Sequence, residues 1–267
     1  MLESFGAFRG VGDELATHRR VIWALLMREL STRYGRHNIG FLWVLGEPLV
    51  FAGAVTLMWS LIKPEFEHGV RVVPFVVTGY MSIILSRHMI NHGMNCVKAN
   101  AGLLYHRQVT ITHLFIARIL LEFIGVTFAF FVIFGFLLLI GQMAPPKNLP
   151  LVYAGWAILA WMGVGLALLF GALAEIFEFM ERIVGVITYI MVPLSGTFYF
   201  AAWVPGQFRR FVLLLPFIHP VEMIRAGFFG EFVKTYYDVA YAVAWSASLT
   251  FLGLVLVQFI RSRVEIE

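Results

Sequence analysis

The sequence has 267 residues, of which 60% are hydrophobic and only 13% are charged. Soluble domains carry about 25% charged residues, so a water-soluble globular fold is excluded and the chain is better divided into membrane spans. The net charge of +4 is modest, no basic patch of the kind that binds nucleic acid is visible, and the single Cys96 allows no disulfide within the chain.

The first 40 residues have the pattern of a surface helix. Between residues 15 and 38, apolar residues alternate at roughly helical spacing with five arginines, namely Arg19, Arg20, Arg28, Arg33 and Arg36. A helix of this kind lies along a membrane surface, with its apolar side toward the lipid. We therefore expect an N-terminal amphipathic interface helix, which serves either as a lipid anchor or as a docking helix for a partner.

Six stretches are long and apolar enough to cross a hydrocarbon core of about 30 Å. The predicted transmembrane helices cover residues 41–62, 72–93, 113–140, 151–173, 183–203 and 239–260. The predicted fold class is therefore an all-α integral membrane protein with six transmembrane helices.

Residues 204–237, between the last two predicted spans, are too apolar for a plain loop. Pro205, Pro216 and Pro220 interrupt this segment, so it cannot form one continuous helix. Non-helical backbone survives at membrane depth only where it packs against protein or lines a wet cavity. We expect re-entrant helices here, dipping into the outer leaflet.

The distribution of Lys and Arg predicts the orientation. Eleven of these residues flank the spans on the side of the termini, against seven on the opposite side. Because cytoplasmic loops keep an excess of Lys and Arg near the span ends, both termini are expected in the cytoplasm. The even number of predicted spans agrees with that placement.

The second half of span 72–93 carries a polar stripe. His88, Asn91, His92 and Asn95 stand at positions i, i+3, i+4 and i+7 and so share one helix face, with Arg87 at its edge. A charged residue at the centre of a span costs about 2.5–3.5 kcal/mol, so such a stripe faces a bundle interior or an aqueous path. Alternatively, the stripe lies at the cytoplasmic end of the helix, where snorkelling satisfies it.

His88 and His92 also have the i, i+4 spacing of two metal ligands. A metal site needs at least a third ligand and an orienting second shell, and neither is evident nearby in the sequence. Glu122 is the nearest intramembrane carboxylate by predicted depth, but Arg118, one helical turn away, is an equally good partner for it. No metal site is predicted.

An aromatic run closes span 183–203. Phe198, Tyr199 and Phe200, followed by Trp203, stand directly before the predicted re-entrant segment. Aromatic faces can stack on the apolar C–H surfaces of sugar rings. The alternative is the ordinary belt of aromatic residues at a membrane interface.

Standard enzyme motifs are missing from the sequence. A phosphate-binding loop requires a Gly-Lys pair, and the chain has none; H-E-x-x-H and G-x-S-x-G are missing as well. We expect a transport protein that is not itself an ATPase.

Several motifs resemble one family, the permeases of type-2 ABC exporters, and within it the subgroup that exports group-2 capsular polysaccharides. The motifs that carry the resemblance are Met27-Arg28-Glu29-Leu30, Thr32-Arg33-Tyr34-Gly35-Arg36, Gly40-Phe41-Leu42-Trp43, Glu47-Pro48, Asn100, Leu103-Leu104-Tyr105-His106-Arg107, Arg118 with Glu122, Pro193-Leu194-Ser195-Gly196, and His219-Pro220 with Glu222 and Arg225. Together they cover nearly the whole chain.

The resemblance implies a homodimer in the bacterial inner membrane, paired with two copies of a separate ABC ATPase subunit that binds ATP and Mg. It also implies a periplasmic polysaccharide co-polymerase, an outer-membrane polysaccharide exporter and an acidic, lipid-linked polysaccharide substrate. The chain itself is expected to hold no cofactor and to bind no nucleic acid.

The resemblance also suggests roles for individual residues. Polymer contacts are expected at Arg33, Arg36, Arg87, His88, Asn91, His92, Phe198, Tyr199 and Phe200. Contacts with the ATPase are expected at Arg28, Glu29, Asn100, Tyr105, His106, Arg107, Glu175, Glu178 and Glu181.

Three alternatives remain open. An intramembrane enzyme would need acidic or nucleophilic clusters, which the sequence does not show. A secondary transporter would move protons through Glu122 or the histidine pair, but the inverted repeats typical of that class are not visible. If the chain is an ABC exporter permease, the main alternative substrate is an O-antigen or a teichoic acid.

Overall fold

The computed structural model describes residues 2–34, 39–105 and 108–264 and is built almost entirely of helices. The α-helices are α1 (Leu2–Tyr34), α2 (Ile39–Ile62), α3 (Val72–Met94), α4 (Ile111–Leu139), α5 (Leu149–Ile176), α6 (Met180–Leu194), α7 (Gly206–Val212), α8 (Ile218–Phe229) and α9 (Val239–Val264). Short 3₁₀ helices lie at η1 (Lys98–Leu103), η2 (Ala201–Trp203) and η3 (Gly230–Phe232), and strands β1 (Phe66–Glu67) and β2 (Val70–Arg71) form a small hairpin.

Five of the described helices, α2, α3, α4, α5 and α9, are long and apolar enough to cross a membrane. This confirms the prediction of an all-α protein with several membrane-crossing helices. Local signals agree with the observed starts: the Thr110 side chain caps α4 in a reciprocal capping box with His113, and Asn148 caps α5.

The structure differs from the prediction over residues 183–203. The helix there, α6, has 15 residues and ends at Leu194, so it is only about 22 Å long. Pro193 removes a backbone donor in its last turn, and Gly196 adopts a left-handed φ of 77°. Residues 195–203 therefore form a turn and the short helix η2 instead of continuing the span, and a count of six spans stays a prediction.

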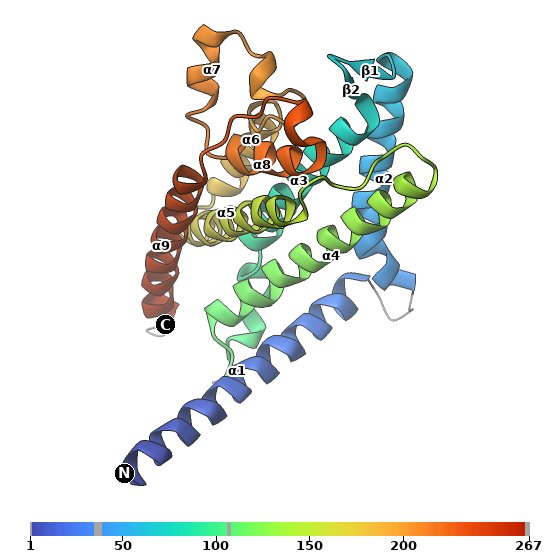
Figure 1. Ribbon diagram of the computed structural model, residues 1–267. Helices are drawn as coiled ribbons and strands as arrows, with labels where there is room; N and C mark the ends of the chain where they lie inside the picture. The colour runs from blue at the N-terminus through green and yellow to red at the C-terminus, as the bar shows by residue number, and fades with distance from the viewer. Residues whose placement is uncertain (1, 35–38, 106–107, 265–267) are drawn as a thin grey trace.

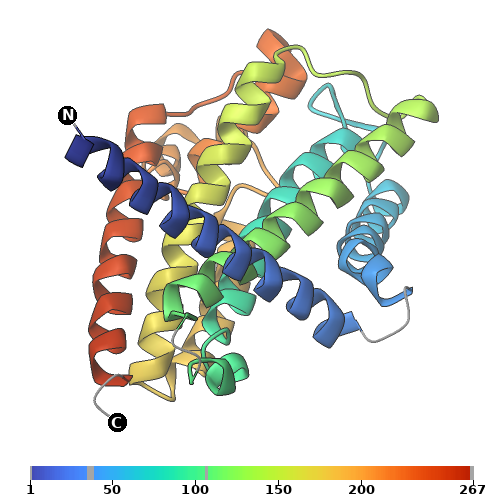
Figure 2. The same cartoon turned by 90° about the horizontal axis from the view of Figure 1, so that it is seen from below.

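The elements sort to two ends of the bundle (Figure 1). At the upper end in that view lie the β1–β2 hairpin and α7, and we call this the hairpin end. At the lower end lie α1 and the C-terminal end of α9, and we call this the α1 end. Seen from below, α1 crosses beneath the other helices (Figure 2). Both described chain ends thus lie at the α1 end, and their placement in the cytoplasm stays a prediction.

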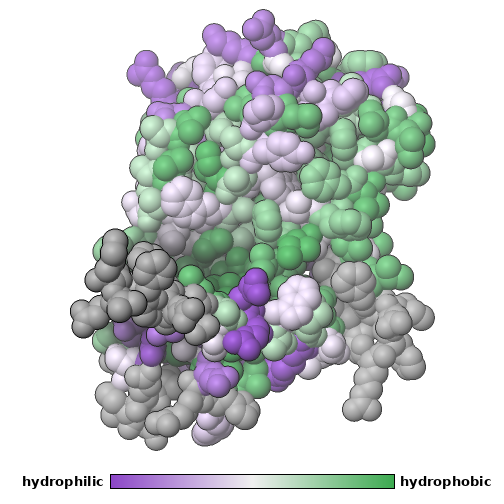
Figure 3. Space-filling model, turned by 60° about the horizontal axis from the view of Figure 1, so that its bottom comes forward, coloured by the Kyte–Doolittle hydropathy of each residue, from purple (hydrophilic) through white to green (hydrophobic). Residues whose placement is uncertain are grey.

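The hydrophobic surface of the molecule forms a band between two more polar regions. Figure 3 shows hydrophobic residues across the middle of one face, with hydrophilic residues gathered above and below them. In an apolar 18-residue stretch of each span, 78% of the residues of α3 and 67% of those of α5 are buried, against 17% for α2 and 22% for α9. Helices α3 and α5 are therefore the core of the bundle, whereas α2 and α9 offer most of their surface to lipid or to another chain.

Two glycines allow α5 and α9 to pack closely. A Cβ added at Gly165 would lie 2.8 Å from the Cβ of Leu249, and one added at Gly253 would lie 2.7 Å from the Cβ of Leu168. Small residues at a helix contact let the backbones approach, which is the main source of packing energy between helices in lipid. The α5–α9 pair is thereby closely packed, and Trp161 Nε1 of α5 adds a hydrogen bond to Thr250 Oγ1 of α9 at 3.1 Å.

The segment predicted to be re-entrant contains two α-helices, α7 and α8, and the 3₁₀ helix η3. Helix α7 is exposed, whereas α8 is buried along 11 of its 12 residues. Gly155 of α5 and Gly227 of α8 let these two helices touch, since an added Cβ at either position would come within 3.0 Å of the other helix. The depth of this segment in a membrane stays a prediction.

Candidate functional site

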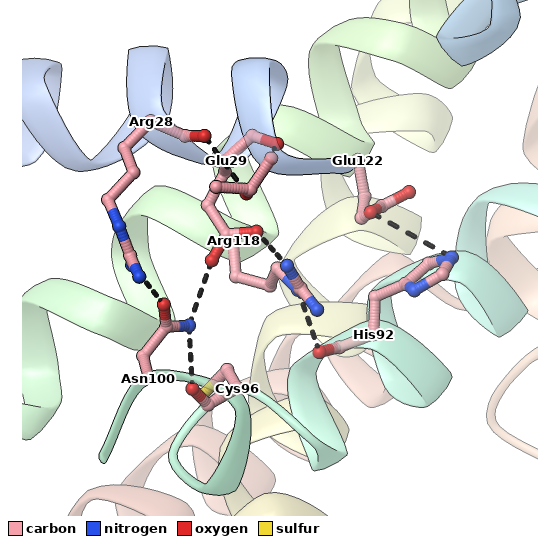
Figure 4. Close-up of polar contacts among 8 residues, drawn as sticks. Arg28, Glu29, His92, Cys96, Asn100, Arg118 and Glu122 are labelled. Carbon is pink, nitrogen blue, oxygen red and sulfur yellow. Dashed lines mark hydrogen bonds and ion pairs between the residues drawn. The ribbon is translucent and has the colours of Figure 1, made fainter. Parts of the chain in front are cut away.

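A buried polar network joins α1 to the bundle (Figure 4). Arg118 Nη1 of α4 pairs with Glu29 Oε2 of α1, and Asn100 Nδ2 of η1 donates to Glu29 Oε1 at 2.8 Å. Asn100 also donates to the carbonyl of Cys96, and Arg118 Nε donates to the carbonyl of His92 at 3.2 Å. Glu29, Asn100 and Arg118 are each less than 9% exposed. Charges at such depth persist only where they are paired and hydrogen-bonded.

The contacts of Glu29, Asn100 and Arg118 differ from those expected from the sequence. Glu29 and Asn100 were expected to contact a partner ATPase, but their side chains are buried and used within the chain. Arg118 pairs directly with Glu29 through its Nη1, and its guanidinium also interacts electrostatically with Glu122, one turn along α4. Nothing in the sequence spacing indicates that pairing, since the two residues are 89 positions apart.

The predicted polar stripe lies in the last two turns of α3. His88 Nδ1 is 3.2 Å from Glu122 Oε2, and His92 Nε2 is 3.9 Å from Glu122 Oε1. The side chain of Glu122 is 5% exposed, and those of His88 and His92 are 18% and 34% exposed. The stripe thus lies at the α1 end of α3 and its histidines face a carboxylate of α4; whether it lines an aqueous path or lies at the cytoplasmic end of the span stays a prediction.

Arg87, at the edge of the stripe, points toward α6. Its guanidinium lies 4.8 Å from the centre of the Tyr189 ring, a cation–π arrangement. Its Nε is buried, yet it has no hydrogen-bond partner among the residues that the structure describes. A buried donor without a partner is costly, so an anionic group of a ligand placed here would be stabilised.

The aromatic run after α6 divides into two roles. Phe198 stacks on Trp59 of α2 with the ring centres 5.1 Å apart, and Phe198 and Tyr199 are half-buried. Phe200 is fully buried, and its ring lies 4.7 Å from the guanidinium of Arg225. Phe200 is therefore a packing residue, with no face left for a sugar ring, whereas Phe198 and Tyr199 remain candidates.

The residues expected to meet an ATPase gather at the α1 end. Arg28, Tyr105 and Glu178 are exposed, and a pocket of about 580 Å³ opens between α1 and the loop after η1. Tyr105 is 91% exposed and lines this pocket. Arg36, His106, Arg107 and the side chain of Arg33 lie outside the part of the chain that the structure describes.

Two further acidic residues differ in their surroundings. Glu181 accepts a hydrogen bond from Lys98, which raises the pKa of that lysine and ties η1 to the start of α6. Glu175 is half-buried at the end of α5. An exposed ion pair such as Lys98–Glu181 contributes only about 0–1 kcal/mol to stability. Little free energy is therefore lost if either side chain turns to a partner protein instead.

Cys96 lies directly under the network and is completely buried. Burial raises the pKa of its thiol, so the reactive thiolate is suppressed. We expect no labelling of the native protein by a maleimide and one label per chain after denaturation, measured by mass spectrometry. As a control, Tyr105→Cys at the exposed position should label in the native state; rapid native labelling of Cys96 would contradict its burial.

Comparisons with known proteins point to one family over most of the chain. The family model described as "ABC-2 type transporter" matches residues 20–229. The chain is 38% identical to the capsule polysaccharide export inner-membrane protein CtrC of Neisseria meningitidis serogroup B, over 95% of this chain and 96% of that protein. It is 36% identical to BexB of Haemophilus influenzae, a protein of the same description, over the same shares, and 24% identical to the polysialic acid transport protein KpsM of Escherichia coli, over 87% and 90%. The chain belongs to the ABC-2 type transporter family.

Proposed function

We propose that this chain is the membrane-spanning subunit of an ABC transporter that exports a capsular polysaccharide across the bacterial inner membrane. The observation that carries the proposal is the similarity to CtrC and BexB over almost the full length of both chains. The membrane-crossing helices supply the passage through the bilayer. A permease of this family has no ATPase domain, and the sequence lacks a phosphate-binding loop, so a separate subunit supplies ATP hydrolysis.

The α1 end is proposed to face the cytoplasm and the partner ATPase. Its exposed residues Arg28, Tyr105 and Glu178 and the pocket beside Tyr105 offer both charge and a recess for a docking element. Glu29 and Asn100 act behind this surface, because they connect α1 and η1 to α4. We propose that two ATPase subunits, each binding ATP and Mg, dock on a homodimer of this chain.

The polymer path is proposed to run between the two copies, along α2, α3 and α6. Only 17% of the residues in the apolar stretch Leu45–Ile62 of α2 are buried within one chain, so this helix is available to line it. Arg87 and the half-exposed His88 and His92 offer positive or hydrogen-bonding groups to an acidic polymer, and Phe198 and Tyr199 offer apolar faces. Periplasmic and outer-membrane export proteins would receive the polymer beyond the hairpin end.

The test of the function is to delete the gene in its host and to locate the polymer by cell fractionation, with complementation by the intact gene. Complete polymer trapped in the cytoplasm supports export as the missing step. If no polymer is made, the chain acts in synthesis. If the capsule still reaches the surface while an O-antigen or a teichoic acid is retained, the exporter carries that polymer instead.

A single substitution tests the proposed path. Arg87→Ala should reduce surface polymer severalfold while leaving the amount of protein in the membrane unchanged, because Arg87 Nε has no partner to lose among the described residues. Surface polymer is measured by immunoassay and protein by quantitative blotting. Arg210→Ala, at an exposed arginine of α7, is the matched control and should export normally. Normal export by the Arg87 variant would remove it from the path.

A further inference from the structure

Three side chains with metal-binding atoms converge where α3 meets α4. His88 and His92 stand one turn apart on α3, and Glu122 reaches them from α4. One ligand atom from each of the three lies within 4.8 Å of the others. The sequence alone offered two ligands; the packing of α3 on α4 supplies the third.

The separations are close to those that a metal ion requires. Zinc binds imidazole nitrogen and carboxylate oxygen at about 2.0–2.2 Å, so two ligands of a tetrahedral site lie roughly 3.3–3.5 Å apart. The distance from His88 Nδ1 to Glu122 Oε2 is 3.2 Å, and that from His92 Nε2 to Glu122 Oε1 is 3.9 Å. All three ligand atoms lie within 4.8 Å of one another, so the side chains would have to rotate inward to meet on one ion.

The local charges also suit a divalent cation. Arg118 lies one turn from Glu122 and would repel a cation, but Glu29 neutralises it through a direct ion pair. Arg87, the next cation on α3, is turned toward the ring of Tyr189. Glu29, Arg118 and Glu122 together carry one negative charge when the two histidines are neutral, so a divalent ion would leave the site at +1.

We propose that His88, His92 and Glu122 bind one divalent transition-metal ion. Two imidazoles and a carboxylate favour zinc, cobalt or nickel, whereas magnesium and calcium prefer oxygen ligands alone. Three protein ligands leave a fourth position for water or for an anionic group. A neutral imidazole coordinates through its unprotonated nitrogen, so His88 would bind the ion through Nδ1 as the tautomer that carries its proton on Nε2, and no proton is lost. The bound ion cross-links α3 to α4 beside the Glu29–Arg118 pair.

Cobalt binding to the purified chain tests the site without any measurement of export, so its outcome is separate from that of the proposed function. The full-length protein is purified in detergent without a polyhistidine tag, stripped with a chelator and titrated with Co²⁺. We expect visible absorption bands of a four-coordinate ion, saturating at one Co²⁺ per chain, and displacement by Zn²⁺. The His92→Ala and Glu122→Gln variants should bind Co²⁺ at least about tenfold more weakly. Loss of a second-shell contact alone weakens metal binding by about 10- to 100-fold, and these variants lose a direct ligand.

Controls separate this site from other histidines and from misfolding. His68→Ala removes an exposed histidine, and His18→Gln removes one member of the pair in which His18 Nδ1 contacts His113 Nε2; both should bind Co²⁺ as the unaltered chain does. His92→Cys keeps a ligand and should still bind, with an added thiolate-to-cobalt charge-transfer band. No saturable Co²⁺ binding by the unaltered chain, or equal binding by the His92→Ala and Glu122→Gln variants, would overturn the proposal.

Discussion

Arg225→Met is expected to prevent the chain from accumulating as a folded membrane protein. Arg225 is fully buried, and its guanidinium donates to the carbonyls of Gly196, Thr197 and Tyr199, in the turn that ends α6. A further donation reaches the carbonyl of Phe75 on α3. This one side chain therefore fixes the turn after α6 to both α8 and α3.

The expected size of the effect follows from what the substitution leaves behind. Each buried carbonyl that loses its donor costs about 1–3 kcal/mol. Arg225 also interacts electrostatically with the buried Glu222, and removing one member of a buried charge pair costs roughly 3–5 kcal/mol. The whole stability of a typical domain is only about 5–15 kcal/mol. Methionine fills a similar volume, so lost polar contacts rather than a cavity would account for the loss.

The measurement is the amount of monodisperse protein in detergent and its melting temperature, both by fluorescence-detected size-exclusion chromatography. Arg225→Lys should also be strongly destabilised, because an ammonium cannot reproduce the planar fork that reaches several carbonyls at once. Arg210→Met, at an exposed position of α7, should behave as the unaltered chain. A near-normal melting temperature for Arg225→Met would show that the turn after α6 does not depend on this guanidinium.

The long helices could be predicted from the sequence because their signals are local. Apolar length and flanking charges placed the starts of α2, α3, α4, α5 and α9 within two residues of the observed ones. The error at α6 has a local cause as well. Pro193 and Gly196 lie inside the predicted span, and both residue types commonly mark the end of a helix. The span was nevertheless predicted to continue because the residues after them are apolar.

The site could be predicted only in part, because its partners come from distant segments. Helical spacing correctly placed His88 and His92 on one face of α3. That this face meets Glu122, and that Arg118 turns to Glu29, depends on how α1, α3 and α4 pack together. Phe200 shows the same limit: its residue type suits a sugar contact, but burial beside Arg225 leaves it a packing role.

Breaking the Glu29–Arg118 pair should have the second largest effect, and the two residues should not act independently. Glu29→Gln leaves Arg118 buried without its counter-charge, and Arg118→Met leaves Glu29 in the same state. Each single variant is expected to lose roughly 3–5 kcal/mol of stability, as other buried pairs do when one member is removed. Export should fall with it, since this pair is a buried ionic link between α1 and α4.

The double variant Glu29→Met with Arg118→Met distinguishes stabilisation by the ion pair from stabilisation by the packing volume of the two side chains. Because it leaves no uncompensated charge, it should recover at least about 1 kcal/mol relative to the sum of the single variants, the coupling expected for residues in direct contact. Melting temperatures in detergent supply the double-mutant cycle. The exposed pair Lys98–Glu181 serves as the control cycle, with a coupling of no more than about 1 kcal/mol. Strict additivity at Glu29 and Arg118 would mean that the two side chains do not pair in the folded protein, and the connection of α1 to the bundle would then rest on its other contacts, such as that of His18 with His113.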